Sequence, residues 1–363
     1  MSKLRLDAQI LKQEVQDFNA QLVASYQVLK EIPPVNIGQT PAETLLTLDK
    51  VSLRYYAPEH PSLVTAPLLI CYALVNRPYM IDLTPQRSLL KTLLSKGVPV
   101  YLIDWGYPDA SDQHLDLDDY INYYLDRCVD AACQHSQREK INLMGICQGG
   151  TFSLCYSALH PEKVERLITL VTPVDFHTPD FVLSQLAKHI DVDLAVKTYG
   201  NIPGTLLNET YQSLMPMRLG LQKNLDLPFS LADKQQAVTF LSMEKWIQDS
   251  PDQAGKAFSE FIKDFFQQNK LIHDQLSIAG KAVRLAKITQ PLLNIYASLD
   301  HLVPPSSSQA LQGKTNSQLY REKSIHSGHI GIFVSSKPGN QLADAIENWL
   351  QPLDKINANQ KPD

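Results

Sequence analysis

The sequence has no excess of basic residues and no long apolar run. Its 38 acidic and 33 basic residues give a net charge of -5, whereas a nucleic-acid-binding protein carries a clustered basic excess. No window holds 18 uninterrupted apolar residues, which a transmembrane helix needs, and the N-terminal "MSKLRLDAQILKQEVQDF" lacks the apolar core of a signal peptide. We therefore expect a cytoplasmic protein with no transmembrane segment and no nucleic-acid partner.

Cysteine is also sparse. The five cysteines form no paired framework, which is typical of a reduced, intracellular protein. No cluster of cysteine and histidine has the spacing of a metal site, so we expect no metal and no cofactor. The composition, 44% hydrophobic and 20% charged over 363 residues, is that of a globular protein with one large domain and an insertion, or with two domains.

Short apolar runs alternate with helix-like segments along much of the chain. Several runs are nearly continuous in Val, Ile and Leu, as in strands covered on both faces. This alternation has the pitch of right-handed βαβ units and predicts an α/β protein with a mostly parallel sheet. The expected strands are 51–56, 66–75, 98–105, 140–145, 165–174, 290–297 and 318–322, with helices over 85–96, 116–135, 150–160 and 339–350.

The alternation breaks between about 176 and 285, where the sequence is mostly helical. A helical cap over the ends of the strands is the simplest account of such an insertion. We therefore expect an N-terminal helical segment at 1–38, a catalytic core built from 39–175 and 286–352, a cap at 176–285 and a flexible tail at 353–363.

Residues 7–31 predict an amphipathic helix that ends before Pro33 and Pro34. Its apolar side chains recur every three to four residues and share one face. That face either docks on the protein's own domain, which we favour, or binds a partner. The residues are Leu11, Val15, Phe18, Leu22, Tyr26 and Leu29.

The stretch "GICQGG" at 145–150 has the layout of a nucleophile elbow, with a cysteine where serine is usual. In such an elbow a strand turns sharply into a helix, and the flanking residues must be small because helix and strand nearly touch. This accounts for Gly145 and Gly149 and makes Cys147 the candidate nucleophile. The backbone N–H of Gln148 would then stand at the helix start, where it stabilises a developing negative charge.

An elbow nucleophile needs an acid and a histidine later in the chain, in that order. Asp300 follows the strand expected at 290–297, and His329 lies in a loop past the last strand. Loops at the carboxyl ends of parallel strands meet at one edge of a sheet. We therefore expect Cys147, Asp300 and His329 to form a catalytic triad.

Two other histidines compete for the role of base. His301 follows Asp300 directly and should point away from it, so His326 is the more serious rival. We favour His329 because the neighbouring Gly328 and Gly331 suit a tight active-site loop.

The second donor of an oxyanion hole comes from the loop after an early strand. Here that loop is "VNRPYMIDL", and we expect the backbone N–H of Val75, or of Asn76 if the register differs by one, to serve. Arg77 in the same loop is interpreted either as a surface charge or as a group that attracts an anionic substrate.

Together these residues and several longer motifs resemble the catalytic subunit of class III polyhydroxyalkanoate synthases, the two-component type. The resemblance covers roughly 40–350, including the cap. Ser327 stands where a glycine is common in that family. The motifs that carry the resemblance are "GICQGG", "YALVNRPYMIDL", "VYLIDWGYPD", "LDDYINYYLDRCVD", "LVTPVDFHTPD", "DLAV", "GNIP", "MEKWIQDSPDQAG", "DHLVPP" and "GHIGIF".

This resemblance implies the α/β-hydrolase fold with a helical cap insertion. It implies an acyltransferase that polymerises (R)-3-hydroxyacyl-CoA, chiefly short-chain, into a polyester and releases CoA. The family's catalytic residues fall on Cys147, Asp300 and His329. The implied partners are a second, PhaE-type synthase subunit, a second copy in a homodimer and the surface of a polyester granule.

A thioester substrate explains sulfur at the elbow. Attack by a thiolate on a thioester gives another thioester of similar energy, so the acyl group stays activated on the enzyme. A thiol with a pKa near 8.5 is only slightly ionised at neutrality, so His329 would take the proton of Cys147. Asp300 would either orient His329 or assist the attacking 3-hydroxyl directly.

A polymerase must keep water from its acyl-enzyme, and aromatic residues of the cap are candidates for a lid. The alternative, that they form the cap's own core, suits the helical spacing of several of them. The residues are Trp246, Phe258, Phe261, Phe265 and Phe266.

Two other functions stay open on the sequence. A cysteine-nucleophile hydrolase acting on esters, lactones or thioesters would have the same triad, and the cap and long family-like segments argue against it. A granule-binding scaffold would work through its N-terminal helix, but it would not need a triad.

Overall fold

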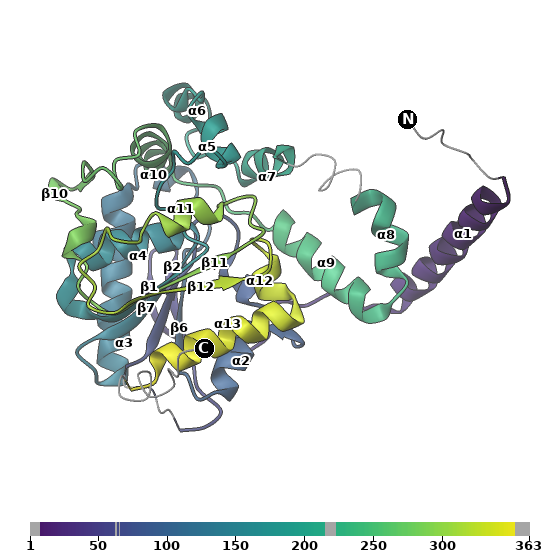
Figure 1. Cartoon of the computed structure of the whole chain (residues 1–363), viewed down its shortest axis with the longest axis horizontal. Helices are drawn as coiled ribbons and strands as arrows, with labels where there is room; N and C mark the ends of the chain where they lie inside the picture. The colour runs from purple at the N-terminus through teal and green to yellow at the C-terminus, as the bar shows by residue number, and fades with distance from the viewer. Residues whose placement is uncertain (1–7, 62–63, 65, 215–222, 353–363) are drawn as a thin grey trace.

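Eight strands form one sheet in the computed structural model of the protein, which describes residues 8–61, 64, 66–214 and 223–352 (Figure 1). The strand order is β1-β2-β6-β3-β7-β8-β11-β12. The β1–β2 and β2–β6 pairs are antiparallel and the other neighbours are parallel. The strands are β1 (Glu43–Leu48), β2 (Val51–Tyr56), β3 (Leu68–Cys71), β6 (Val100–Asp104), β7 (Ile141–Ile146), β8 (Val164–Leu170), β11 (Leu292–Ala297) and β12 (Tyr320–Ile325).

The predicted mostly parallel sheet is therefore confirmed, with differences at its edges. Strand β1 was not expected, because "ETLLTL" lacks a long apolar run and the strand pairs with β2 at the sheet's edge. The run 66–75 was too long as a strand. Its second half leaves the sheet after Cys71 and forms a loop that contributes to the candidate site.

Helices cover both faces of the sheet (Figure 1). Alternate strand residues point to opposite faces, so Leu69 packs with α3 and α4 while Leu68 packs with α2 and α13. The helices of this domain are α2 (Leu89–Ser95), the π-helix η3 (Asp119–Leu125), α3 (Asp126–Ser136), α4 (Gln148–Leu159), α11 (Pro305–Gln309), α12 (Gly331–Val334) and α13 (Ser336–Leu350). Short 3₁₀ turns are η1 (Pro78–Ile81), η2 (Ala110–Asp112), η4 (Pro161–Lys163) and η7 (Leu285–Lys287).

A mostly helical segment separates β8 from β11. The helices of the segment are α5 (Val182–Ala187), α6 (Val192–Tyr199), α7 (Gly204–Ser213), α8 (Lys223–Leu231), α9 (Lys234–Gln248), α10 (Gly255–Phe261) and the π-helix η6 (Ile262–Gln267).

Two short antiparallel ribbons lie outside the main sheet. They pair β4 (Asp82–Thr84) with β5 (Arg87–Ser88), and β9 (Ser277–Ile278) with β10 (Lys281–Ala282).

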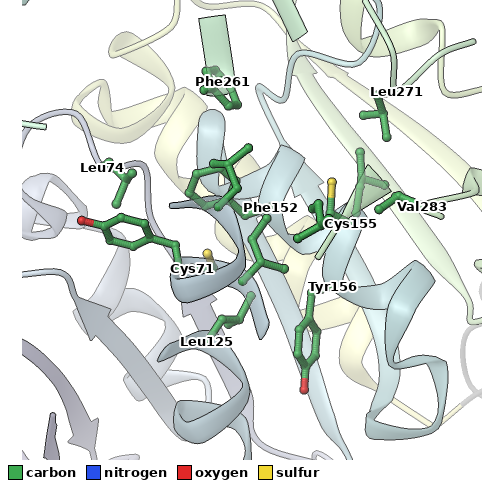
Figure 2. Close-up of a cluster of buried hydrophobic side chains, with 14 of the residues drawn as sticks. Cys71, Leu74, Leu125, Phe152, Cys155, Tyr156, Phe261, Leu271 and Val283 are labelled. Carbon is green, nitrogen blue, oxygen red and sulfur yellow. The ribbon is translucent and has the colours of Figure 1, made fainter. Parts of the chain in front are cut away.

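The aromatic residues of α10 and η6 pack into the core of the sheet domain. Phe261 lies against Phe152 of α4, with ring centroids 5.9 Å apart (Figure 2). Its ring also contacts those of Phe176 and Phe265. Phe265 and Phe266 are buried in the same cluster. These phenylalanines are therefore core residues rather than a lid, but the core they join is that of the sheet domain and not a separate core of the cap.

The N-terminal helix α1 (Ala8–Glu31) extends away from the sheet and lies beside α8 and α9 (Figure 1). Phe18 touches Phe229 of α8, at a centroid distance of 6.3 Å. Helix α1 thus packs mainly on α8 and α9 of its own chain. Much of the apolar face of α1 remains open to solvent. The side chains left 38–63% exposed are Ile10, Leu11, Val15, Phe18, Leu22, Val23, Tyr26 and Leu29.

None of the described helices is long and apolar enough to cross a membrane. The expected tail at 353–363 lies outside the described residues.

Candidate active site

Cys147 occupies the turn between β7 and α4 with backbone angles that few non-glycine residues adopt. Its φ is 54° and its ψ is -123°. Such a conformation costs about 1–3 kcal/mol and persists only where the surroundings fix it. Here the Cys147 N–H donates to the carbonyl of Leu170 at 2.9 Å, and its carbonyl accepts from the N–H of Gly150 at 2.9 Å. The elbow therefore holds the thiol at the start of α4.

Three glycines allow α4 to approach the strands beside the elbow. A Cβ atom on Gly149 would lie 2.2 Å from the carbonyl oxygen of Cys71, and one on Gly145 would lie 2.4 Å from the Cα of Gly150. Gly150 is equally restricted, since its Cβ would lie 1.8 Å from Thr172 Oγ1. The sequence indicated Gly145 and Gly149 but not Gly150, which faces Thr172 in the loop after β8.

The variant Gly149→Ala is expected to lower the free energy of unfolding by about 3 kcal/mol, because the new methyl group meets backbone atoms that cannot rotate away. Gly339→Ala in α13 is the matched control, since its Cβ meets no atom closer than 3.4 Å and alanine favours a helix. Urea unfolding of both variants measures the difference. Equal stabilities would contradict the proposed crowding at the elbow.

His329 joins Cys147 to Asp300. Its Nδ1 lies 2.6 Å from Asp300 Oδ2, and its ring is close enough to Cys147 for the cysteine side chain to raise the pKa of the imidazole. His329 is buried in the loop between β12 and α12, and the side chain of Asp300 is only 1% exposed. The structure thus brings together the three residues that the sequence singled out.

The pKa of His329 is raised well above its usual value. Burial lowers it, but the negative charges of Asp300 and of ionised Cys147, with their hydrogen bonds, outweigh burial. With the Asp300 carboxylate on one side and an ionised Cys147 on the other, the imidazole of His329 is therefore protonated at neutral pH. The N-terminus of α4 adds a favourable dipole at the sulfur. This arrangement can hold a thiolate–imidazolium pair.

Asp300 is fixed by its own turn. Oδ1 accepts from the N–H groups of Leu302 and Val303, both at 2.9 Å, while Oδ2 faces His329. Both carboxylate oxygens are thus occupied in this conformation. The geometry suits a residue that orients the histidine.

The two rival histidines lie outside this relay. His326 is exposed, and its Nδ1 lies 3.1 Å from Ser298 Oγ. His301 is half-buried beside Asp300, whereas the carboxylate of Asp300 faces His329.

The loop after β3 is fastened on both sides of Val75 and Asn76. The Leu74 N–H donates to Gln148 Oε1 at 3.0 Å, so the residue after the nucleophile holds the near end. At the far end, Trp246 Nε1 donates to the carbonyl of Arg77 at 2.8 Å. The N–H of Gln148, at the first position of α4, has no partner within the helix. The loop and the helix start thus both border Cys147.

Arg77 corrects both interpretations made from the sequence. The residue is 7% exposed, so it is not a surface charge. Its guanidinium donates to Asp104 Oδ2 at 2.8 Å and to the Gly106 carbonyl at 2.7 Å, and it lies 4.1 Å from the centre of the Tyr107 ring. These contacts use its charge within the protein, where it anchors the loop.

The C-terminal end of α9 holds this loop from the cap side. Besides the Trp246 bond, the carboxylate of Asp249 accepts from the hydroxyls of Tyr79 and Tyr107. Trp246 itself is 5% exposed. The aromatic residue considered for a lid therefore connects the cap to the candidate oxyanion loop.

Loss of the indole N–H in Trp246→Phe is expected to reduce the free energy of unfolding by about 1 kcal/mol beyond the packing loss, because the Arg77 carbonyl then keeps only the 3.4 Å bond from the Met80 N–H. Trp349→Phe is the matched control, because Trp349 is equally buried and its Nε1 has no partner. Chemical denaturation of the two variants isolates the hydrogen bond. Equal losses would rule out a stabilising role for it.

Two tyrosines complete the surroundings of the sulfur. Burial raises the pKa of Tyr72, at the end of β3, and the charge of Cys147 raises it further. The same two causes raise the pKa of Tyr211 on α7. Tyr211 thus brings a cap residue near the nucleophile, which no sequence motif indicated. Among the described residues, no group of three or more His, Cys, Asp or Glu side chains could hold a metal ion.

Comparisons with known proteins agree with this architecture. Residues 66–336 match the model of the alpha/beta hydrolase fold family. The poly(3-hydroxyalkanoate) polymerase subunit PhaC of Allochromatium vinosum is 51% identical over 342 residues, which cover 94% of this chain and 96% of that protein. The PhaC subunit of Synechocystis sp. is 46% identical and covers 93% and 92%.

Among solved structures, a soluble variant of monoglyceride lipase from Saccharomyces cerevisiae, in complex with a substrate analogue, is similar in fold. Its TM-score is 0.51 at 15% identity, over 87% of this chain and 96% of that one. At this identity the likeness extends to the fold alone.

Proposed function

Because the chain belongs to the family of poly(3-hydroxyalkanoate) polymerase PhaC subunits, with an α/β-hydrolase domain, we propose that it makes polyester through a covalent thioester on Cys147. The substrate is (R)-3-hydroxyacyl-CoA with a short side chain, chiefly the 3-hydroxybutyryl thioester. The observation that supports this most is the relay from Cys147 through His329 to Asp300, with 2.6 Å between His329 Nδ1 and Asp300 Oδ2.

In the first step the thiolate of Cys147 attacks the thioester carbonyl. The new bond joins sulfur to carbon, and the carbonyl electrons move to oxygen, where the N–H groups of Gln148 and Val75 stabilise the charge. When the intermediate collapses, the bond to the CoA sulfur breaks and the leaving thiolate takes the proton of the His329 imidazolium. The acyl group remains an activated thioester.

In the second step, the 3-hydroxyl of one unit attacks the thioester carbonyl of another. An ester bond forms to the hydroxyl oxygen, the carbon–sulfur bond of that thioester breaks, and the sulfur leaves as a thiolate. An alcohol is a poor nucleophile at neutral pH, so neutral His329 accepts its proton. We assign Asp300 the role of holding His329, because its Oδ1 is taken by two backbone N–H groups and its side chain is 1% exposed. A substrate hydroxyl has no route to it in this conformation.

Growth of a chain requires that water be kept from the acyl-enzyme. The burial of His329 and Asp300, and the approach of Tyr211 from the cap, support such exclusion. No cofactor takes part in this proposal.

We further propose that α1 binds a second, PhaE-type synthase subunit. Its apolar side chains, Val23 at 63% and Tyr26 at 58% among them, remain exposed beside α8. Assembly as a homodimer in the cytoplasm, at the surface of polyester granules, completes the proposal.

Incubation with (R)-3-hydroxybutyryl-CoA, with and without the second subunit, tests the function. Free CoA together with insoluble polyester supports the polymerase. Free CoA with soluble 3-hydroxybutyrate would indicate a thioesterase instead. Absence of CoA release under both conditions would overturn the assignment.

The pH dependence of the first CoA release gives a separate test of the relay. Since Asp300 helps to raise the pKa of His329, the imidazolium survives to higher pH in the wild type than in Asp300→Asn. The alkaline fall in the rate is therefore expected to move to lower pH in the variant. A single-turnover profile measures it, and an unmoved alkaline limb would contradict the electrostatic role of Asp300.

A further inference from the structure

Asn76 lies in the loop after β3, and its side chain is buried. The amide nitrogen of this side chain has no hydrogen-bond partner. The residue is 9% exposed. Buried polar groups are nearly always paired, and leaving one unpaired costs about 1–3 kcal/mol. This unpaired donor belongs to the loop that Gln148, the residue after Cys147, holds through the Leu74 N–H, which suggests that a ligand bound at Cys147 supplies the missing acceptor.

The loop around Asn76 is held by hydrogen bonds on both sides of the residue. Gln148 Oε1 holds Leu74, and Trp246 Nε1 holds the Arg77 carbonyl. Other described side chains also contain unpaired buried atoms, Arg77 Nε and Ser157 Oγ among them. The Arg77 guanidinium, however, is already bound to Asp104 and Gly106.

The backbone of Asn76 is also unusual. Its φ is 59°, in the left-handed region that glycine and asparagine occupy most easily. Glycine would serve this turn as well, so the backbone alone does not require an amide here. The amide brings a donor of hydrogen bonds without a charge, which suits a carbonyl oxygen that becomes negative during the reaction.

We propose that the Asn76 side chain is a further catalytic residue, whose Nδ2 donates to the reacting carbonyl oxygen of the acyl thioester beside the Val75 and Gln148 N–H groups. This inference rests on the proposed acyl transfer to Cys147. The amide gains or loses no proton in the step. It pairs with the oxygen that receives the carbonyl electrons.

The variants Asn76→Gly and Asn76→Asp separate the amide from the backbone. Glycine keeps the positive φ and removes the donor, while aspartate keeps the shape and offers only acceptors. Both are expected to slow the first CoA release from (R)-3-hydroxybutyryl-CoA about 100-fold. Thermal unfolding close to that of the wild type is expected for Asn76→Gly, whereas Asn76→Asp is expected to unfold at a lower temperature because it buries a charge. Ser157→Ala, which removes a buried unpaired hydroxyl from α4, is expected to leave the rate unchanged.

A second acyl donor keeps this test independent of the polymerase proposal. The burst of nitrophenolate from p-nitrophenyl butyrate reports acylation of Cys147 without CoA. A wild-type burst without CoA release would sink the polymerase proposal alone, and the burst rates of the variants would still decide on Asn76. Wild-type burst rates in both folded Asn76 variants, or no burst in any protein, would overturn the catalytic role of Asn76.

Discussion

Replacing Cys147 with alanine is expected to lower the rate of CoA release from (R)-3-hydroxybutyryl-CoA by about 10⁵-fold, because no other group can form the acyl-enzyme. Rapid-quench measurement of free CoA tests this. The matched control is Cys133→Ala, which removes a half-buried thiol from α3 and should keep wild-type activity. A loss in the control equal to that in Cys147→Ala would point to damage of the fold instead.

The companion variant Cys147→Ser asks whether sulfur itself matters. A serine hydroxyl ionises far less readily than a thiol, and its ester is less activated than a thioester. We therefore expect slow acylation and no polymer. Polymer formation at the wild-type rate in this variant would refute the thioester argument.

The variant Asp300→Ala is expected to separate the two steps of the reaction. The nucleophile of the first acylation is a thiol, which ionises far more readily than an alcohol, so this step is slowed but continues. Elongation requires His329 to remove a proton from an alcohol, and the resulting imidazolium has lost its anion. Elongation should therefore fall by about 10⁴-fold, the typical effect of removing the acid of a triad.

The two steps are measured separately on the same sample. A single equivalent of (R)-3-hydroxybutyryl-CoA gives the rate of the first release, and an excess of the substrate gives polymer yield. If Asp300→Ala lowers the rates of the first release and of elongation by the same factor, Asp300 has no additional role in elongation. Asp300→Asn keeps the size of the side chain and controls for cavity formation.

The sequence could predict what local patterns determine. The elbow has its own short signature around Cys147, and the strands beside it are long apolar runs, so their place in a mostly parallel sheet followed directly, while the α/β-hydrolase fold followed from the family resemblance. Asp300 and His329 were accessible because they come after strands whose ends share one edge of the sheet. Pairs of residues that meet only in the folded protein had no such signal in the sequence. Trp246 and Arg77 are 169 residues apart, and the Asp104 that neutralises Arg77 belongs to another strand.

The interpretation of the apolar residues shows the same limit. A helical repeat of phenylalanines is equally compatible with a lid and with a core, and only their contact with Phe152 of α4 distinguishes the two. The N-terminal helix had a correct span, but its neighbours α8 and α9 were not apparent. The proximity of Tyr211 to Cys147 depends on how the cap folds back.

Gln148 would behave in a mutational scan as if it were a catalytic side chain, although the reaction as proposed uses only its backbone N–H. Its Oε1 holds the Leu74 N–H from across the elbow, so most replacements would release the loop that carries Val75 and Asn76. Every amino acid except proline supplies a backbone N–H. Selection can nevertheless act on this backbone contribution to catalysis, because the side chain at position 148 holds the loop beside it.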